Sequence, residues 1–354
     1  MLFWLVVILG IVFIYYFVIK KYDRSEKDFL IMAAIWIIAI LGSRYFWNGF
    51  TDEVTYNFEY VEYSRKSFDD LLAARWGERD FGFYLVYWAM SQVVPWNQFP
   101  IYFITALFTF ASFRFIYKNS DYPLISVLLL FVIPGFAFYM AAYRQCFATC
   151  FCLFAFEYAK RKKFVPYALL VAIACTMHIS AVIFIPVYWL IRLKNNRTGI
   201  IVWLLTLIGT WFAENAMMIY ASDVVGRDYT QAQEFSLLGF GIQLIIMLAP
   251  FILDIFNISA WRDDEKDKRF RTWILLSFGI LFYFSKLYNY SFERVSYYYS
   301  FFAIVALANS CARVARGTGD SLRLNRIVPA VVIILLILLI AWRSPKDLTF
   351  FFLK

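Results

Sequence analysis

His178, the only histidine in the chain, lies near the middle of an apolar segment with basic ends. Lys160–Lys163 precedes the uncharged run Phe164–Ile191, and a second basic cluster, Arg192–Arg197, follows it. Imidazole changes its charge near neutral pH and therefore suits a general acid or base. An ionisable side chain within an apolar segment of membrane length is a candidate functional site.

The length of this segment predicts its path. One membrane crossing needs about 20 apolar residues, so Phe164–Ile191 is too long for one helix and short for two. Both flanks are basic, and cytoplasmic loops collect Lys and Arg. We therefore expect the segment to enter the bilayer and return, with its turn near Thr176–Ser180 and His178 at or near the outer face.

The composition identifies the class of protein. Hydrophobic residues make up 62% of the 354 residues and aromatic residues 22%, beyond the range of soluble domains. We predict one all-α polytopic membrane domain over residues 1–354, with about 11–12 transmembrane segments including a short two-helix hairpin. The net charge of +9 arises from short basic clusters between apolar runs, which indicates topology signals and contact with the lipid bilayer, not nucleic acid. The five cysteines have no paired C-x-x-C spacing, so neither a disulfide framework nor a metal site is expected.

The alternation of apolar runs and basic loops predicts the topology. Residues 48–100 form an outer loop region, in which Phe81–Val94 is expected to be a re-entrant or interfacial helix, and residues 214–235 form a second outer loop. The other expected spans are Leu2–Ile19, Phe29–Trp47, Tyr102–Tyr117, Leu124–Ala141, Gln145–Ala159, Ile200–Ala213, Leu237–Ile258, Trp273–Tyr288, Ser291–Asn309 and Ile327–Trp342.

On this topology the remaining polar residues collect at the outer ends of helices and in outer loops. They are Arg44, Asp52, Tyr56, Arg79, Asp80, Arg144, Gln145, His178, Arg227, Asp228 and Arg294. An arginine at helix-centre depth costs about 2.5–3.5 kcal/mol, so several around one face require a function. Guanidinium groups bind phosphate bidentately. A lipid-linked phosphate or pyrophosphate at the outer leaflet is the expected ligand.

Five short motifs, in order from Arg44 to Tyr298, resemble those of the EpsG family. Arg44 followed by Gly49, Asp52 and Tyr56 resembles the family's opening R…G…D…Y signature. Glu78 with Gly82-Phe83 is similar to its E-x-G-[FY] element, with two extra residues before the glycine. The remaining matches are Arg144-Gln145 to R-Q, His178-Ile-Ser180-Ala181 to H-x-[ST]-A, and Arg294-Val-Ser-Tyr297 to R-x-x-Y.

The resemblance implies a Wzy-like glycosyltransferase with a GT-C-like membrane domain. Such an enzyme joins undecaprenyl-pyrophosphate-linked repeat units of exopolysaccharide, capsule or O-antigen on the outer, periplasmic face of the bacterial cytoplasmic membrane. Donor and acceptor would both be lipid-linked glycans, and polysaccharide export or chain-length-control proteins are possible partners. The sequence has no Walker loop and no G-x-G-x-x-G motif, and arginines supply positive charge, so no cofactor and no metal is expected.

Roles follow for the motif residues. His178 or Asp52 would take the proton from the attacking hydroxyl, while Arg144 and Arg294 would stabilise the departing pyrophosphate. The expected substrate-binding residues are Arg44, Tyr56, Glu78, Arg79, Gln145, Tyr297 and Tyr298.

Simpler roles remain open for the same residues. His178 could pack a helix break, Arg144 could extend to the membrane interface, and Arg294 could pair with Glu293. Asp52 could be an ordinary loop residue or pair with Arg44. The tyrosines near residue 297 could belong to the aromatic belt at the membrane surface.

Two other functions compete with polymerisation. A membrane O-acyltransferase also relies on a histidine in a helical membrane domain, but it gives the outer arginines less to do. A flippase for a lipid-linked glycan would use the arginines as a loading site, but transporters usually carry an internal repeat with broken helices in both halves. Only one broken hairpin is apparent here.

Overall fold

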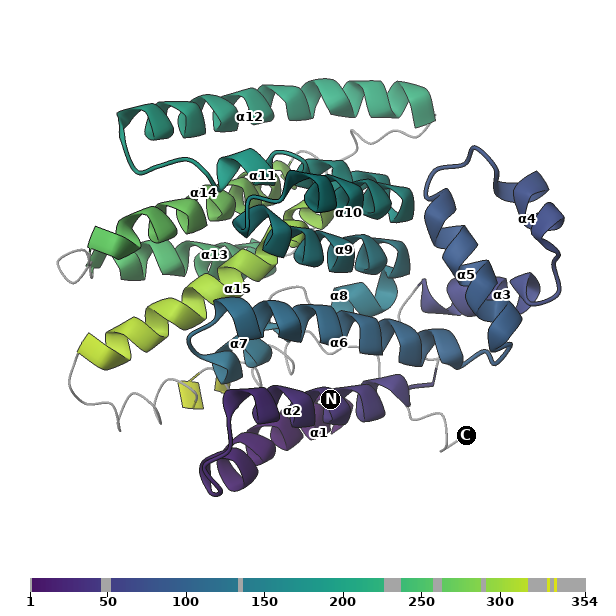
Figure 1. Cartoon of the computed structure of the whole chain (residues 1–354), viewed down its shortest axis with the longest axis horizontal. Helices are drawn as coiled ribbons and strands as arrows, with labels where there is room; N and C mark the ends of the chain where they lie inside the picture. Colours follow the sequence, from purple (N-terminus) through teal and green to yellow (C-terminus); the bar gives the residue numbers. More distant parts are fainter. Residues whose placement is uncertain are drawn as a thin grey trace.

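A computed structural model describes residues 2–45, 52–132, 136–225, 237–256, 263–287, 291–317, 330–331 and 334–335. Within these ranges the chain is helical, without strands (Figure 1). The helices are α1 (Leu2–Phe13) with a π-helical continuation (Ile14–Lys20), α2 (Glu26–Gly42), α3 (Glu53–Tyr63), α4 (Phe68–Arg75), α5 (Phe81–Val93), α6 (Phe99–Asn119), α7 (Pro123–Leu129), α8 (Phe136–Ala141), α9 (Tyr143–Lys160), α10 (Phe164–Met177), the 3₁₀ helix η3 (Ile179–Phe184), α11 (Val187–Leu190), α12 (Arg197–Val225), α13 (Leu237–Phe256), α14 (Asp263–Ser285) and α15 (Ser291–Gly317).

The all-helical prediction is therefore confirmed for the described residues, and this fold is consistent with a helical membrane protein. Two described helical segments, Phe99–Asn119 of α6 and Phe292–Arg313 of α15, are long and apolar enough to cross a membrane, and shorter apolar helices accompany them. The GT-C-like arrangement and the number of crossings stay predictions.

Aromatic rings join α6, α9 and α15 at the centre of the bundle. Phe301 of α15 lies 6.0 Å from both Phe108 and Phe115 of α6, measured between ring centroids, in edge-on geometry. Phe302 lies 4.9 Å from Phe156 of α9. Such pairs add about 0.5–1.5 kcal/mol each beyond the burial of their area. Contacts between phenylalanine rings thus hold α6, α9 and α15 in place relative to one another.

The segment around His178 folds as an excursion that returns, as predicted. α10 leaves the basic cluster Lys160–Lys163, and η3 and α11 bring the chain back. At the end of this hairpin opposite His178, the Tyr188 hydroxyl donates to the carbonyl of Lys162 at 3.0 Å. Arg192 donates to the carbonyl of Ala159 at 3.2 Å. Both basic flanks therefore lie at the same end of the hairpin.

Three short helices, α3, α4 and α5, form a separate layer at one end of the bundle (Figure 1). They occupy the predicted outer loop region. Tyr56 of α3 stacks on Tyr143 of α9, with ring centroids 4.7 Å apart. Phe83 of α5 packs edge-on against Phe147 of α9 at 5.8 Å. These rings hold the layer against the start of α9. That the layer faces the outside stays a prediction.

The structure differs from the predicted spans in several places. α12 continues to Val225, so the first part of the predicted loop 214–235 is helical; this stretch contains Ala, Met and Glu but no Gly or Pro, which favours a helix. The expected span Leu124–Ala141 consists of two short helices, α7 and α8. Arg227 and Asp228, and most of the expected span Ile327–Trp342, lie outside the described residues.

Candidate active site

Asp80 connects two motifs that are far apart in the sequence. Its Oδ2 lies 3.0 Å from Nδ1 of His178, and its Oδ1 accepts a hydrogen bond from the backbone N–H of Ile179 at 3.0 Å. The Asp80 side chain is 5% exposed and that of His178 is 29% exposed. Because an ionised carboxylate only accepts hydrogen bonds, Nδ1 of a neutral His178 carries the proton. Its Nε2 is then left as a proton acceptor.

The same carboxylate stabilises the helix break that presents His178. α10 ends at Met177 because His178 adopts extended backbone angles, φ −160° and ψ 121°. The N–H of Ile179 can therefore no longer bond to a carbonyl four residues earlier, and Asp80 supplies its acceptor. Backbone N–H groups away from water need such a partner. The site and the break in the helix thus depend on one side chain.

Local backbone geometry brings Asp80 to this position. Its φ of 63° lies in the left-handed region, which Asp tolerates better than most residues. Two residues later Gly82 lies directly against the end of α10. A Cβ built on Gly82 would lie 2.3 Å from Thr176 Oγ1 and 3.0 Å from the Thr176 carbonyl oxygen. Only glycine allows α5 and α10 to approach this closely.

Arg144 completes the cluster from the first turn of α9. Its Nη1 lies 3.3 Å from Asp80 Oδ2 and 3.4 Å from the Tyr84 hydroxyl, and its Nε donates to the Tyr56 hydroxyl at 3.3 Å. The side chain is 38% exposed. Within the described part of the chain, its Nη2 group has no hydrogen-bond partner and is available to a ligand.

Asp80 and Tyr56 differ in the direction of their pKa shifts. Burial acts to raise the pKa of Asp80, but the hydrogen bond and charge of His178, the Ile179 amide and the charge of Arg144 together lower it below its ordinary value. Asp80 is therefore ionised at neutral pH. Burial raises the pKa of the Tyr56 phenol, although Arg144 acts in the opposite direction. Tyr56 is thus a neutral hydroxyl that can donate a hydrogen bond.

A second cation, Arg75 of α4, lies near the same tyrosine ring as Arg144. The Arg75 guanidinium carbon is 4.3 Å from the centroid of the Tyr84 ring, and that of Arg144 is 5.9 Å from it. Arg75 is held by Glu78 Oε2 at 2.9 Å and by the Tyr63 hydroxyl at 3.0 Å. The tyrosine ring is thus flanked by two guanidinium groups at the edge of the layer.

An open cavity of about 430 Å³ adjoins Asp80. Its volume is within the about 300–1,000 Å³ typical of small-ligand sites. The residues that line it come from the start of α5 and the end of α10: Glu78, Arg79, Asp80, Phe81, Gly82, Leu85, Cys175, Thr176 and Ile179. Glu78 and Arg79 are exposed. Two predicted substrate-binding residues therefore line the cavity.

Arg44, in contrast, is fully buried and does not lie on the surface of the site. Its Nη2 lies 2.5 Å from Glu53 Oε1 and its Nε 3.3 Å from Glu53 Oε2, and neither side chain is exposed. Glu53 Oε1 also accepts a hydrogen bond from the Tyr143 hydroxyl at 2.8 Å. Because Tyr143 precedes Arg144, this buried pair fixes the start of α9. The arrangement gives Arg44 a supporting role in place of the predicted direct contact with substrate.

The motif Arg294-Val-Ser-Tyr297 lies in the first turns of α15, next to the start of α9. Gln145 Nε2 donates to the backbone carbonyl of Arg294 at 2.5 Å, which places Arg294, with its exposed side chain, next to the start of α9. The Tyr298 hydroxyl lies 3.0 Å from Ser180 Oγ. Tyr297 and Tyr298 are buried. The structure gives both tyrosines and Gln145 packing and positioning contacts.

Asp52 is exposed at the residue before α3. The Tyr56 amide donates to the Asp52 carbonyl at 3.1 Å, so Asp52 is one turn from the tyrosine that holds Arg144. No hydrogen bond connects its side chain with the other described site residues. Its predicted role as a base stays untested.

Tyr84, Arg75 and Glu53 are site residues that the sequence did not identify, and Asp80 was placed among the outer polar residues without a role. A signal for Asp80 was present, since Asp80-Phe81-Gly82-Phe83 has the E-x-G-[FY] spacing with Asp in place of Glu. The acid two residues before the glycine is the one that contacts His178 and Arg144, whereas Glu78 contacts Arg75. No sequence pattern marked Arg75 or Tyr84.

The described residues contain no group of three or more His, Cys, Asp or Glu side chains arranged to hold a metal ion. The cations at the site are guanidinium groups: Arg79 lines the cavity, and Arg144 contacts Asp80, which also lines it. They suit a phosphate-bearing ligand, which they can bind through charge-assisted hydrogen bonds.

Comparison with known proteins gives one match. A family model described as EpsG family matches residues 29–353, nearly the whole chain. Neither the curated proteins nor the solved structures gave a match. The matched range contains every residue of the cluster around Asp80.

Proposed function

The chain belongs to the EpsG family, and we propose that it is a polysaccharide polymerase that joins undecaprenyl-pyrophosphate-linked oligosaccharide repeat units. The family supports a role in exopolysaccharide synthesis by a glycosyltransferase-like reaction. The observation that carries the proposal is the meeting of Asp80, His178 and Arg144 beside the cavity. This arrangement unites an oriented base with a phosphate-binding cation.

The acceptor would be activated by His178. Asp80 holds Nδ1, so Nε2 takes the proton as the acceptor hydroxyl oxygen attacks the anomeric carbon of the donor sugar. General bases of this kind contribute about 10²–10⁴-fold to a rate. Asp80 acts as a positioning residue that selects the tautomer and stabilises the imidazolium that forms.

Arginines would stabilise the leaving group. When the new glycosidic bond forms, the bond between the anomeric carbon and the pyrophosphate oxygen breaks, and undecaprenyl pyrophosphate departs with the electron pair. Negative charge develops on that oxygen, where preorganised donors are most effective. Arg144 is proposed as the first ligand of the pyrophosphate, with Arg294 and Arg75 nearby. Glu78 and Arg79 are proposed to contact the glycan.

The proposed location is the outer face of the bacterial cytoplasmic membrane. The layer α3–α5 and the break at His178 would face outward, where lipid-linked units for capsule, O-antigen or other exopolysaccharides are assembled. The GT-C-like fold, and docking of export or chain-length-control proteins, belong to the same proposal.

Analysis of lipid-linked intermediates tests this function. Cells that lack the protein should accumulate single lipid-linked repeat units at the outer face and make no long polymer. Complementation with Arg144→Ala or His178→Ala should leave the same intermediates, while Arg65→Ala, an exposed arginine in the loop after α3, should restore polymer. Long polymer from stably expressed Arg144→Ala and His178→Ala would contradict the proposal.

The same experiment separates the two rival functions. Repeat units that accumulate at the inner face would indicate a flippase. Normal polymer that lacks acyl groups, together with loss of radiolabelled acetyl transfer to the glycan, would indicate an O-acyltransferase.

A further inference from the structure

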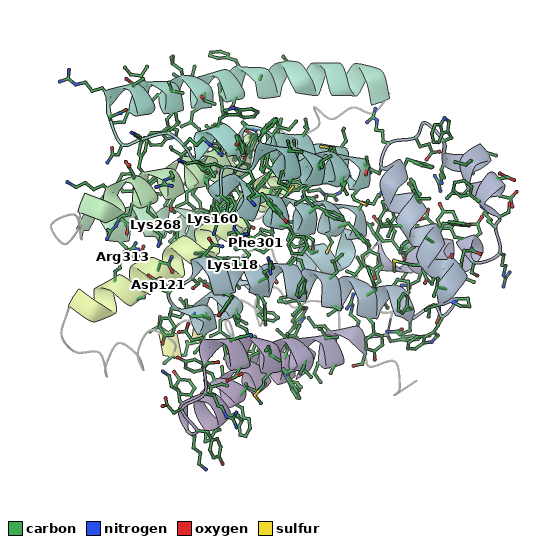
Figure 2. The ribbon with its side chains drawn as sticks, viewed as in Figure 1. Lys118, Asp121, Lys160, Lys268, Phe301 and Arg313 are labelled. Carbon is green, nitrogen blue, oxygen red and sulfur yellow. The ribbon has the colours of Figure 1, made fainter. Side chains whose placement is uncertain are left out.

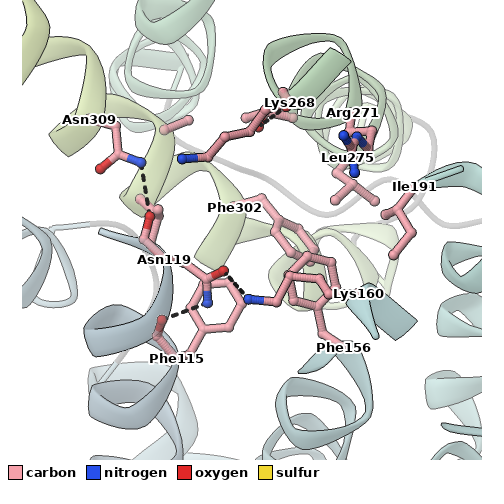
Figure 3. Close-up of a pocket in the computed structure, with 13 residues that line it drawn as sticks. Phe115, Asn119, Phe156, Lys160, Ile191, Lys268, Arg271, Leu275, Phe302 and Asn309 are labelled. Carbon is pink, nitrogen blue, oxygen red and sulfur yellow. Dashed lines mark hydrogen bonds between the residues drawn. The ribbon is translucent and has the colours of Figure 1, made fainter. Parts of the chain in front are cut away.

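A second cavity (Figure 3) is lined by Phe156 and Lys160, at the opposite end of α9 from Arg144. Lys160, at the end of α9, is about 24 Å from Arg144 along the helix axis at 1.5 Å per residue. The cavity has a volume of about 130 Å³ and lies between α6, α9, α14 and α15. In Figure 2 the labelled Lys160 and Lys268 lie close together and far from α3–α5. This cavity is therefore distinct from the candidate active site.

Its lining combines an apolar floor with a basic rim. The rings of Phe115, Phe156 and Phe302 form the floor, and Lys268 and Arg271 extend along the rim above them (Figure 3). The carboxylates of Asp and Glu are absent from the described lining. An amphiphilic ligand with an anionic head matches this division.

A neighbouring cavity of about 370 Å³ extends the basic region. It shares Lys160, Ile191 and Arg271 with the first cavity. The cations that line one or both cavities are Lys160, Lys162, Arg192, Lys194, Lys268 and Arg271, against the single lining acid Asp267. Such a balance attracts an anion strongly near a membrane surface.

Several of these cations are not used by the protein itself. Lys160 is occupied, because its Nζ donates to Asn119 Oδ1 and pairs with Glu157 Oε1, both at 2.8 Å. Arg271 uses only its Nε, which donates to the Asp267 carbonyl at 2.9 Å, and Lys268 has no ion pair among the described residues. Buried Nη1 of Arg192 also has no hydrogen-bond partner there. Because a buried donor without an acceptor is unfavourable, this atom indicates an absent acceptor.

We propose that these two cavities, which share three lining residues, bind the phosphate headgroup of an anionic membrane lipid. Lys268, Arg271 and Arg192 would contact the phosphate, and an acyl chain would lie over the phenylalanine floor. Topology alone accounts for basic residues in the loops at this end. It does not account for an aromatic floor beneath them or for the buried Nη1 atom of Arg192, which lacks a hydrogen-bond partner among the described residues although Nη2 donates to Ala159. The bound lipid would join α9 to α14 through their basic ends.

Lipid retention by the full-length protein tests the proposal. The protein is placed in phosphatidylcholine nanodiscs with increasing phosphatidylglycerol, and bound lipid is counted by native mass spectrometry. The variant Lys268→Ala/Arg271→Ala should bind phosphatidylglycerol about thirtyfold more weakly than the unchanged protein. The matched control Arg161→Ala/Lys163→Ala removes two exposed cations of the cluster Lys160–Lys163 that line neither cavity, and should bind normally.

Several outcomes would overturn the proposal. Equal affinity in the two double variants would mean that charge alone attracts the lipid. Retention of phosphatidylcholine as tightly as phosphatidylglycerol would exclude an anionic site. Displacement of phosphatidylglycerol by an equal concentration of glycerol phosphate would indicate a soluble phosphate ligand. If Lys268→Ala/Arg271→Ala does not fold, the single variant Lys268→Glu replaces it and should lose phosphatidylglycerol in the same way.

Discussion

Asp80 and His178 are separated by 98 residues in the sequence, yet Asp80 Oδ2 lies 3.0 Å from His178 Nδ1. The same oxygen lies 3.3 Å from Nη1 of Arg144. One carboxylate therefore orients the proposed base, anchors the proposed phosphate-binding cation, and accepts the amide hydrogen of Ile179 at the helix break. We therefore infer that Asp80, and not Glu78, is the acid of the element that resembles E-x-G-[FY].

Asp80→Asn should abolish most of the activity while the protein still folds. Asn also tolerates the left-handed backbone that Asp80 adopts, and its size is nearly the same. The amide no longer fixes the proton on Nδ1 of His178, so we expect polymer synthesis to fall by about 10²–10⁴-fold, the range of general base catalysis. Polymer length in cells and monodisperse behaviour in detergent measure the two effects. Unchanged polymer in Asp80→Asn would remove Asp80 from the mechanism.

Gly82→Ala should separate α5 from α10. The added methyl would lie 2.3 Å from Thr176 Oγ1, so the helices must move apart and carry Asp80 away from His178. A displacement near 1 Å lowers an enzymatic rate by about 10²-fold. Thr176→Gly added to Gly82→Ala removes the closest clash and should restore part of the activity. Ala89→Ser, at an exposed position of α5, is the control and should be neutral.

The buried pair of Arg44 and Glu53 should govern stability. Arg44→Leu leaves the Glu53 charge buried without its partner, which typically costs about 3–5 kcal/mol. Arg44→Leu/Glu53→Gln removes both charges and should lose less than Arg44→Leu alone. Thermal unfolding in detergent measures both variants. Equal stability of Arg44→Leu and the unchanged protein would show that the pair has no such role.

The ionised form of Asp80 should stabilise the fold in a defined pH range. Its pKa is lowered from 3.8 in the folded state, so the unfolded chain binds its proton more readily. The stabilisation is therefore present above pH 3.8 and is lost as the pH falls through the lower folded-state pKa. The unfolding temperature of the unchanged protein should exceed that of Asp80→Asn at pH values above 3.8, and the difference should shrink as the pH falls below 3.8. A difference that grows toward acid pH would contradict the assigned direction.

The sequence predicted the parts of this structure that depend on composition and on short-range pattern. Apolar length and basic flanks were enough to predict the returning path around His178. The length of an apolar run limits how often it can cross a bilayer, and clusters of Lys and Arg mark the cytoplasmic side. The motif order led to Arg144 and His178. The partner of His178 could not be predicted, because Asp80 reaches it only through the left-handed turn and the close contact at Gly82.

Burial likewise could not be read from the sequence. Arg44 looks like a substrate-binding arginine until Glu53 is placed beside it, and a buried ion pair is a long-range contact with no periodic signal. Arg75 and Tyr84 meet because α4 folds back on α5, a loop geometry that short motifs do not specify. Tyr297 and Tyr298 resemble binding residues in sequence but lie within the helical packing.

Reconstitution with defined substrate tests the proposed function most directly. The purified protein in liposomes receives undecaprenyl-pyrophosphate-linked repeat units as both donor and acceptor, without nucleotide, and products are separated by length. We predict a ladder of polymer and release of undecaprenyl pyrophosphate with the unchanged protein and with Arg65→Ala, and no ladder with His178→Ala or Arg144→Ala. A ladder of the same length and yield from His178→Ala and Arg144→Ala would contradict the central claim, as would its absence with the unchanged protein.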